Sequence, residues 1–109
     1  RGWVNINGPL VQATSEQHYM VSADVSSNLQ DGARAVLRIA AYDGSSYLRE
    51  LSSLGTAITG ELATRTVAGN VPDAALSVQP YIQLSYEIGT VVDDTITIRS
   101  ASLTRSVAQ

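Results

Sequence analysis

Apolar and polar residues alternate along most of the chain, which is the pattern of a β-strand with one buried face. In residues 17–27, Tyr19, Val21, Ala23 and Val25 take every second position, and the residues between them are mainly polar. Side chains at every second position of a strand point to the same side of a sheet. The pattern therefore predicts a strand with one face in the core.

Residues 75–86 repeat this pattern more cleanly, with one exception. Pro80 falls on the apolar side of the predicted strand. Proline has no N–H group to donate to a neighbouring strand, so it is confined largely to sheet edges and bulges. We therefore expect this strand to lie at a sheet edge or to carry a bulge at Pro80.

The last predicted strand, residues 90–104, changes its apolar parity partway along. Ile96 and Ile98 share one parity, whereas Ala101 and Leu103 have the other. One extra residue in a strand, a β-bulge, brings residues of both parities to the same face. The sequence predicts a bulge near Arg99 and Ser100.

Two other segments are less regular. Residues 33–42 contain good helix formers, but Ala35, Leu37 and Ile39 also alternate, and the segment ends at a Gly-containing turn, which favours a strand. Residues 50–60 are expected to form a loop that crosses between sheets. The predicted strands are residues 2–6, 9–14, 17–27, 33–42, 46–52, 61–68, 75–86 and 90–104. Eight short strands separated by turns predict a single all-β domain over residues 1–109, an antiparallel β-sandwich of the jelly-roll kind.

Composition removes several classes of chemistry. The 109 residues include no Cys, no Phe and one His, and all seven cationic side chains are Arg. There is therefore no thiol nucleophile, no cysteine-based metal site and no lysine for Schiff-base chemistry. The net charge of −3 argues against nucleic acid as a partner. No apolar run approaches the length of about 18 residues that suggests a membrane span, so no membrane insertion is expected.

Catalytic constellations are not indicated either. His18 and Asp24 face the same way in the strand of residues 17–27, but six residues of strand separate them by about 20 Å. Asp93 and Asp94 are adjacent, so in a strand they point to opposite faces and cannot act as an acid–base pair on one bond. We predict no catalytic residue and no enzyme activity.

Asp93 and Asp94 allow two other interpretations. Carboxylates at the end of a loop are typical calcium ligands. Alternatively, Asp94 is an inward carboxylate whose oxygens accept hydrogen bonds from backbone N–H groups. The residues alone leave both open.

Tyrosine and glutamine side chains suggest where a ligand would bind. Tyr81 lies between Gln79 and Gln83 on the polar face of the strand of residues 75–86, and an aromatic ring flanked by amides suits the apolar face of a pyranose. Tyr42 and Tyr47 bracket the turn after the strand of residues 33–42 and suggest a second site, carried by a loop. The plainer alternative is that half-exposed tyrosines on a sheet bind nothing.

Three segments carry a family resemblance: residues 9–25, 33–47 and 89–105, which read PLVQATSEQHYMVSADV, ARAVLRIAAYDGSSY and GTVVDDTITIRSASLTR. They resemble parts of the carbohydrate-binding modules related to families 4, 9 and 22, which have the galactose-binding-like jelly-roll fold. The resemblance implies a non-catalytic module that binds a glycan or polysaccharide. It also implies a structural calcium ion, held by Asp93 or Asp94.

The same resemblance suggests an alternative role, because similar modules occur in phage tail and decoration proteins. In that case the chain is a structural protein of a virion or filament, and it uses the fold for assembly with neighbouring copies or other subunits. The family pattern opens with strands that have no counterpart here, so a sheet edge or core groove is expected to be covered by another chain. Trp3 is the predicted interface residue. Both roles imply an extracellular or virion-surface location.

Overall fold

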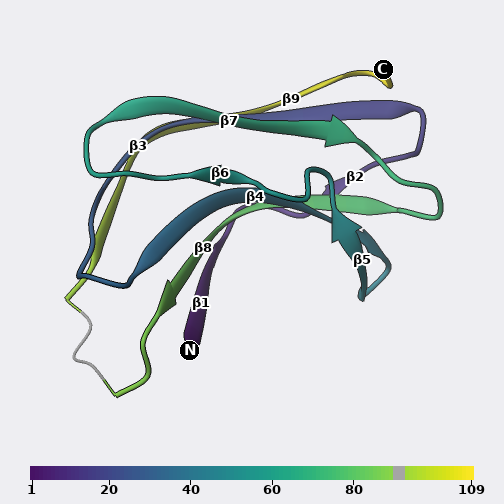
Figure 1. The fold of residues 1–109 in the computed structure, drawn as a ribbon. Coiled ribbons are helices and arrows are strands. Elements are labelled where there is room, and N and C mark those ends of the chain that lie inside the picture. The colour runs from purple at the N-terminus through teal and green to yellow at the C-terminus, as the bar shows by residue number, and fades with distance from the viewer. Residues whose placement is uncertain (90–92) are drawn as a thin grey trace.

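A computed structural model of the chain describes residues 1–89 and 93–109. In these ranges the chain forms two antiparallel sheets packed as a sandwich, with no helical residue (Figure 1). This confirms the predicted all-β sandwich, including a strand rather than a helix after residue 33. Within the described ranges, no helix has the length and apolar character needed to cross a membrane. The strands are β1 (Gly2–Asn7), β2 (Val11–Gln12), β3 (Gln17–Asn28), β4 (Arg34–Asp43), β5 (Ser46–Glu50), β6 (Thr56–Ala57), β7 (Ala63–Asn70), β8 (Ser77–Tyr86) and β9 (Thr95–Val107).

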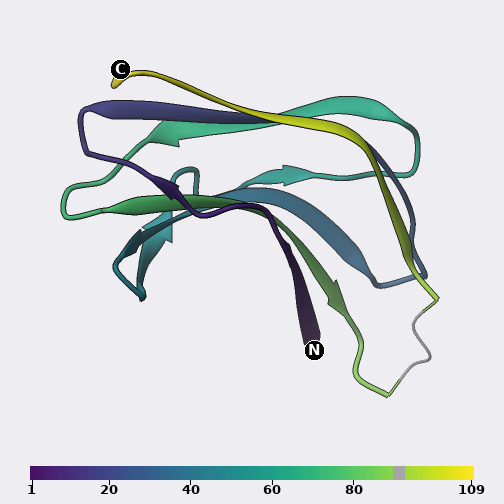
Figure 2. The ribbon, with the colours of Figure 1, turned by 180° about the vertical axis from the view of Figure 1, so that it is seen from behind.

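The two sheets differ in width. The wide sheet has the order β1-β8-β4-β5, with β2 also paired to β8 and β6 also paired to β4. The narrow sheet has the order β7-β3-β9. In Figures 1 and 2, β5 at one end of the wide sheet and the N-terminal part of β1 at the other both bend away from the narrow sheet. The outer face of the wide sheet is therefore concave.

The core between the sheets is aliphatic, as a chain without Phe requires. Val25, Ile39 and Val78, from β3, β4 and β8, are the largest side chains that are fully buried. They occupy the alternating apolar positions seen in the sequence, so the parity of each strand sets which of its faces is buried. The polar positions of β4 and β8 consequently face outward.

The bulge predicted in the last strand is present. Val25 of β3 pairs with Ile98 of β9, and Asp24 pairs with Ser100, so Arg99 has no partner residue in β3. The extra residue brings Ile98 and Ala101 to the inner face despite their opposite parity. The bulge therefore lets apolar residues on both sides of it face the core along the whole of the 13-residue strand β9.

The prediction that the strand of residues 75–86 lies at a sheet edge or carries a bulge at Pro80 is wrong. β8 is an interior strand between β1 and β4, and no register irregularity accompanies the pairing of Pro80 with Ile39. The neighbouring strand is interrupted instead: β1 ends at Asn7, β2 begins at Val11, and the N–H of Gly8 donates to the carbonyl of Pro80 over 2.8 Å. The N and C=O of one strand residue point to the same side. The missing N–H of Pro80 therefore faces this interruption.

Several predicted boundaries also change. The strand expected over residues 9–14 is reduced to β2, where Pro9 and the bend after β1 interrupt pairing. Residues 50–60 include β6, which pairs with β4 before the chain crosses to β7 in the narrow sheet. Of the last predicted strand, residues 90–92 lie outside the described ranges.

Candidate functional site

A hollow of about 260 Å³ lies on the outer, concave face of the wide sheet. Side chains from β1, β4, β5 and β8 surround it, so it depends on four segments far apart in the sequence. They are predominantly aromatic and polar, which distinguishes them from the aliphatic core. The lining residues are Asn5, Asn7, Tyr42, Tyr47, Glu50, Tyr81 and Gln83.

Strand register explains why these residues meet. Asn7 is opposite Tyr81 and Asn5 is opposite Gln83 in the pairing of β1 with β8. Cross-strand partners point to the same face of a sheet. Because the inner face of β8 carries its apolar residues, these four side chains all point outward.

A hairpin brings the other half of the site. β4 and β5 pair with Tyr42 opposite Tyr47, and the two rings pack edge to face with centroids 5.9 Å apart. The turn between them passes through Gly44 at a φ of 58°, a conformation that favours glycine. Glu50, at the end of β5, is opposite Ala40, whose small side chain leaves room beside it.

The Glu50 carboxylate ties the two halves together. The Tyr81 hydroxyl donates to Glu50 Oε1 over 2.8 Å, and the Tyr47 hydroxyl donates to Glu50 Oε2 over 2.7 Å. Hydrogen bonds to an ionised acceptor are among the stronger ones in proteins. The two tyrosine rings are thus held in place by one carboxylate before any ligand arrives.

This arrangement changes the acidity of both phenols. Partial burial raises the pKa of Tyr47 to about 12, and the hydrogen bond and negative charge of Glu50 act in the same direction. The pKa of Tyr81 is raised by the same causes, again with burial as the largest. Arg38, opposite Tyr81 on β4, opposes both shifts through its positive charge.

We expect Tyr47 and Tyr81 to ionise above the ordinary tyrosine range. Between pH 10 and about 12 the folded chain keeps a proton at Tyr47 that the unfolded chain has released, so the free energy of unfolding falls as the pH rises through this window. A titration of tyrosinate absorbance measures the ionisation. In the control Glu50→Gln the charge is lost, and both midpoints should move down. Ionisation of Tyr47 and Tyr81 near pH 10 contradicts the expectation.

The structure brings four of the five predicted ligand residues together. Tyr42 and Tyr47 line the same hollow as Tyr81 and Gln83, rather than a separate site on a loop. The reason is that β5 folds back beside β4 and places its ring on the same sheet face. Gln79 shares this face but does not line the hollow; its side-chain N–H donates to the carbonyl of Gly8 over 3.0 Å and so fixes the bend after β1.

Sequence reasoning missed Asn5, Asn7 and Glu50. The two asparagines alternate with Val4 and Ile6, which marks them as one face of a strand. The pattern does not show which strand pairs with this one, because β1 pairs with β8, more than 70 residues later in the sequence. Glu50 gave no signal of its own.

The hollow is chemically suited to hydroxyl-rich ligands. Its three amide side chains offer both donors and acceptors, and each Glu50 oxygen keeps a lone pair beyond the one that accepts a tyrosine proton. Aromatic carbon borders these polar groups. Glu50 is the single carboxylate among the seven lining residues.

The acidic pair predicted as calcium ligands lies at the other end of the sandwich. Asp94 Oδ1 accepts a hydrogen bond from the backbone N–H of Gln30 over 2.6 Å, as in the alternative interpretation, while Oδ2 is buried and has no hydrogen-bond partner among the described residues. Asp93 is exposed. Calcium takes six to eight oxygen ligands, and the described residues contain no group of three or more side chains suited to a metal. The described residues do not by themselves make such a site, and calcium stays a prediction.

The residues weighed as a catalytic pair have other partners. His18 Nδ1 lies 3.0 Å from Asn70 Oδ1. The hydroxyls of Thr64 and Ser100 donate to the two carboxylate oxygens of Asp24 over 2.5 and 3.0 Å, and these bonds, with the charge of Arg99, lower the pKa of Asp24. The two side chains therefore do not form a site together.

Trp3 lies on the outer face of the wide sheet, on the same side of β1 as Asn5 and Asn7. It is 59% exposed in the single chain. Its predicted role at an interface stays a prediction.

Comparisons of the chain with protein-family models, with curated proteins and with solved structures each found no match.

Proposed function

We propose that the chain is a non-catalytic β-sandwich module that binds glycans on the concave outer face of its wide sheet. The two-sheet antiparallel sandwich is the fold that the resemblance to carbohydrate-binding modules implies, and it supports the proposal. Sugar hydroxyls would donate hydrogen bonds to the Glu50 carboxylate and would exchange hydrogen bonds with the side-chain amides of Asn5, Asn7 and Gln83. A pyranose face would lie against a tyrosine ring.

One observation carries this proposal: four of the five side chains that the sequence suggests as ligand residues, Tyr42, Tyr47, Tyr81 and Gln83, line a single hollow. Tyrosines scattered at random over the faces of the two sheets would not be expected to gather in one place. The Glu50 bridge adds a second argument, because it fixes the Tyr47 and Tyr81 rings in advance. Such pre-organisation lowers the entropy lost on binding.

The charge of the site favours neutral glycans. Glu50 brings a negative charge into the hollow, and the chain as a whole carries a net charge of −3. The Glu50 carboxylate would repel an anionic polysaccharide bound in the hollow. Binding to one shallow hollow is expected to be weak, so useful strength would come from several copies presented together.

A glycan array tests the proposal. The wild-type chain, displayed in several copies on one carrier, is expected to bind neutral oligosaccharides in preference to sialylated or sulfated ones. Tyr42→Ala should reduce the signal, because it removes the ring that packs against Tyr47 at 5.9 Å. A multivalent wild-type sample that binds no glycan contradicts the proposal.

The alternative role, assembly in a virion or filament, depends on a different part of the molecule. It requires a surface that another chain covers. The side of the sandwich between β1 and β9 is the region where the structure offers one.

A further inference from the structure

Trp3 lies on the same outer face as the hollow but outside it. In the pairing of β1 with β8 it is opposite Ser85, and it has the same parity as Asn5 and Asn7. Its side chain is 59% exposed, and it is not among the residues that line the hollow. A large, exposed aromatic ring beside a proposed sugar site is a candidate for a further part of that site.

The polar face of the sheet is continuous between Trp3 and the hollow. Asn5 is opposite Gln83, and this pair lies between the row of Trp3 and the row of Tyr81. Both side chains of the pair line the hollow. A ligand that leaves the hollow along β1 and β8 therefore meets two amides and then the indole ring of Trp3.

The shape of the wide sheet brings Trp3 toward the space above the hollow. The N-terminal part of β1, which carries Trp3, and the strand β5 both bend away from the narrow sheet (Figures 1 and 2). This end of β1 therefore forms one wall of the concave outer face, and the hairpin that carries Tyr47 forms the opposite wall. A ligand that fills the concave face would contact both walls.

Ser85 and Arg34 place polar groups beside Trp3. Ser85 is opposite Trp3 in β1 and opposite Arg34 in β4, so the three side chains form one row across the outer face. Arg34 is exposed. A hydroxyl and a guanidinium can donate hydrogen bonds to sugar oxygens while an aromatic ring packs against the apolar face of the sugar. This row therefore repeats the combination of aromatic ring and polar groups that is present in the hollow.

The spacing of the two aromatic rows determines what can contact both. Ser85 and Tyr81 are four residues apart on β8, which separates the rows of Trp3 and Tyr81 by about 13 Å along the strand. This span is longer than one sugar ring. A single sugar cannot contact both aromatic side chains, whereas a chain of several sugars can.

We propose that Trp3 forms a second aromatic subsite, and that the outer face binds a linear neutral oligosaccharide along β1 and β8. One sugar of the chain packs in the hollow beside Tyr81, and another packs against Trp3. The inference rests on the proposed glycan site and extends it from one hollow to a longer binding surface.

The dependence of affinity on oligosaccharide length tests this inference. The probes are the linear neutral tetrasaccharide with the strongest signal on the glycan array and the disaccharide obtained from it. In calorimetry, Trp3→Ala is expected to weaken binding of the tetrasaccharide about tenfold, because an aromatic contact is lost, and to change the affinity for the disaccharide less than about twofold. Val4→Ala is the matched control, because Val4 is also exposed but shares the inner face of β1 with the partner of Leu84, so both affinities should stay as in the wild type.

Fluorescence gives a second readout, because Trp3 is the single tryptophan of the chain. The tetrasaccharide should shield Trp3 from quenching by acrylamide, and the disaccharide should not. If the tetrasaccharide binds but Trp3 stays open to the quencher and Trp3→Ala has no effect, the second subsite is wrong while the site in the hollow stands. If the wild-type chain binds no glycan, both proposals fail. Shielding of Trp3 that rises with protein concentration alone would place the ring between copies and overturn the inference.

Discussion

Replacing Tyr81 by alanine is expected to weaken glycan binding about thirtyfold. Tyr81 lies centrally in the hollow, between Asn7 of β1 and Arg38 of β4. Aromatic side chains at the centre of a binding surface contribute about 2 kcal/mol or more, which corresponds to this factor. The substitution also removes the hydrogen bond to Glu50 Oε1 and releases one side of the carboxylate. Calorimetry with the best ligand from the array measures the effect.

Two further variants separate stacking from positioning. Tyr81→Phe keeps the ring but loses the bond to Glu50, so its affinity should fall between those of the wild type and Tyr81→Ala. Tyr86→Ala is the matched control, because Tyr86 is a tyrosine of the same strand with the opposite parity, and its ring lies against Gly2 rather than in the hollow. A Tyr81→Ala protein that binds as tightly as the wild type would exclude the hollow as the glycan site.

Strand parity predicts much of this site because it decides which side chains face outward. It placed Tyr81 and Gln83 on one polar face, and it favoured a strand for residues 33–42 against their helix propensity. It also located the bulge at Arg99, since a change of parity within one strand leaves few other solutions. These are local properties, readable from neighbouring residues.

Pairing between strands is not local, and the errors arise there. Pro80 predicts a sheet edge or a bulge when the neighbouring strand is continuous, but here the neighbouring strand is interrupted between β1 and β2. Likewise, the contribution of Asn5 and Asn7 depends on β1 lying beside β8, and that of Glu50 on the way β5 returns along β4. No short-range pattern contains this information.

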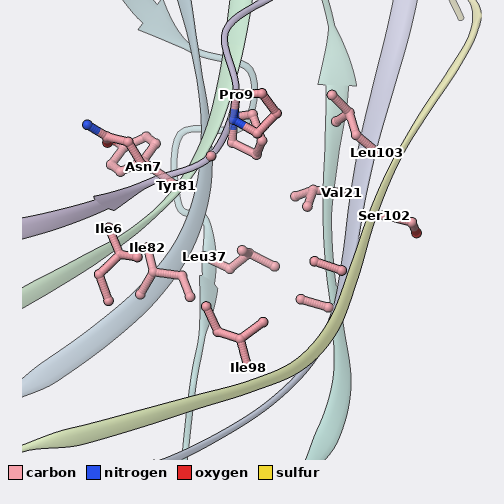
Figure 3. Close-up of a pocket in the computed structure, with 14 residues that line it drawn as sticks. Ile6, Asn7, Pro9, Val21, Leu37, Tyr81, Ile82, Ile98, Ser102 and Leu103 are labelled. Carbon is pink, nitrogen blue, oxygen red and sulfur yellow. The ribbon is translucent and has the colours of Figure 1, made fainter.

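β1 borders two cavities of the sandwich. Its outer side chains, Asn5 and Asn7, line the hollow, and its inner side chain Ile6 lines an apolar cavity of about 240 Å³ between the sheets, to which Asn7 also contributes (Figure 3). β1 is an edge strand paired only with β8 in the described structure. The position of the two asparagines in the hollow therefore depends on this single pairing.

Gly69→Ala is expected to destabilise the fold by about 3 kcal/mol, because overpacking against a fixed backbone costs this much or more. A Cβ at Gly69 would lie 2.2 Å from the carbonyl oxygen of Leu51. Leu51 cannot easily retreat, since its N–H donates to Ile39 over 2.9 Å and its side chain is in the core. Because Glu50 precedes Leu51, any displacement should also disturb the hollow. Urea unfolding measures the free energy, and glycan affinity reports on the site.

Two other glycines provide the controls for this effect. At Gly60 a Cβ would meet only the carbonyl oxygen of Ser27, at 3.7 Å, so Gly60→Ala should change the free energy of unfolding by less than about 0.5 kcal/mol. At Gly44 nothing lies within 4 Å, but φ is 58°, so Gly44→Ala should cost about 1 kcal/mol from backbone strain alone. The loss in the free energy of unfolding is therefore expected to be largest at Gly69, smaller at Gly44 and smallest at Gly60. This order distinguishes the effect of close packing from that of backbone strain. If Gly69→Ala unfolds at the same urea concentration as Gly60→Ala, the tight contact between β7 and Leu51 is not part of the native structure.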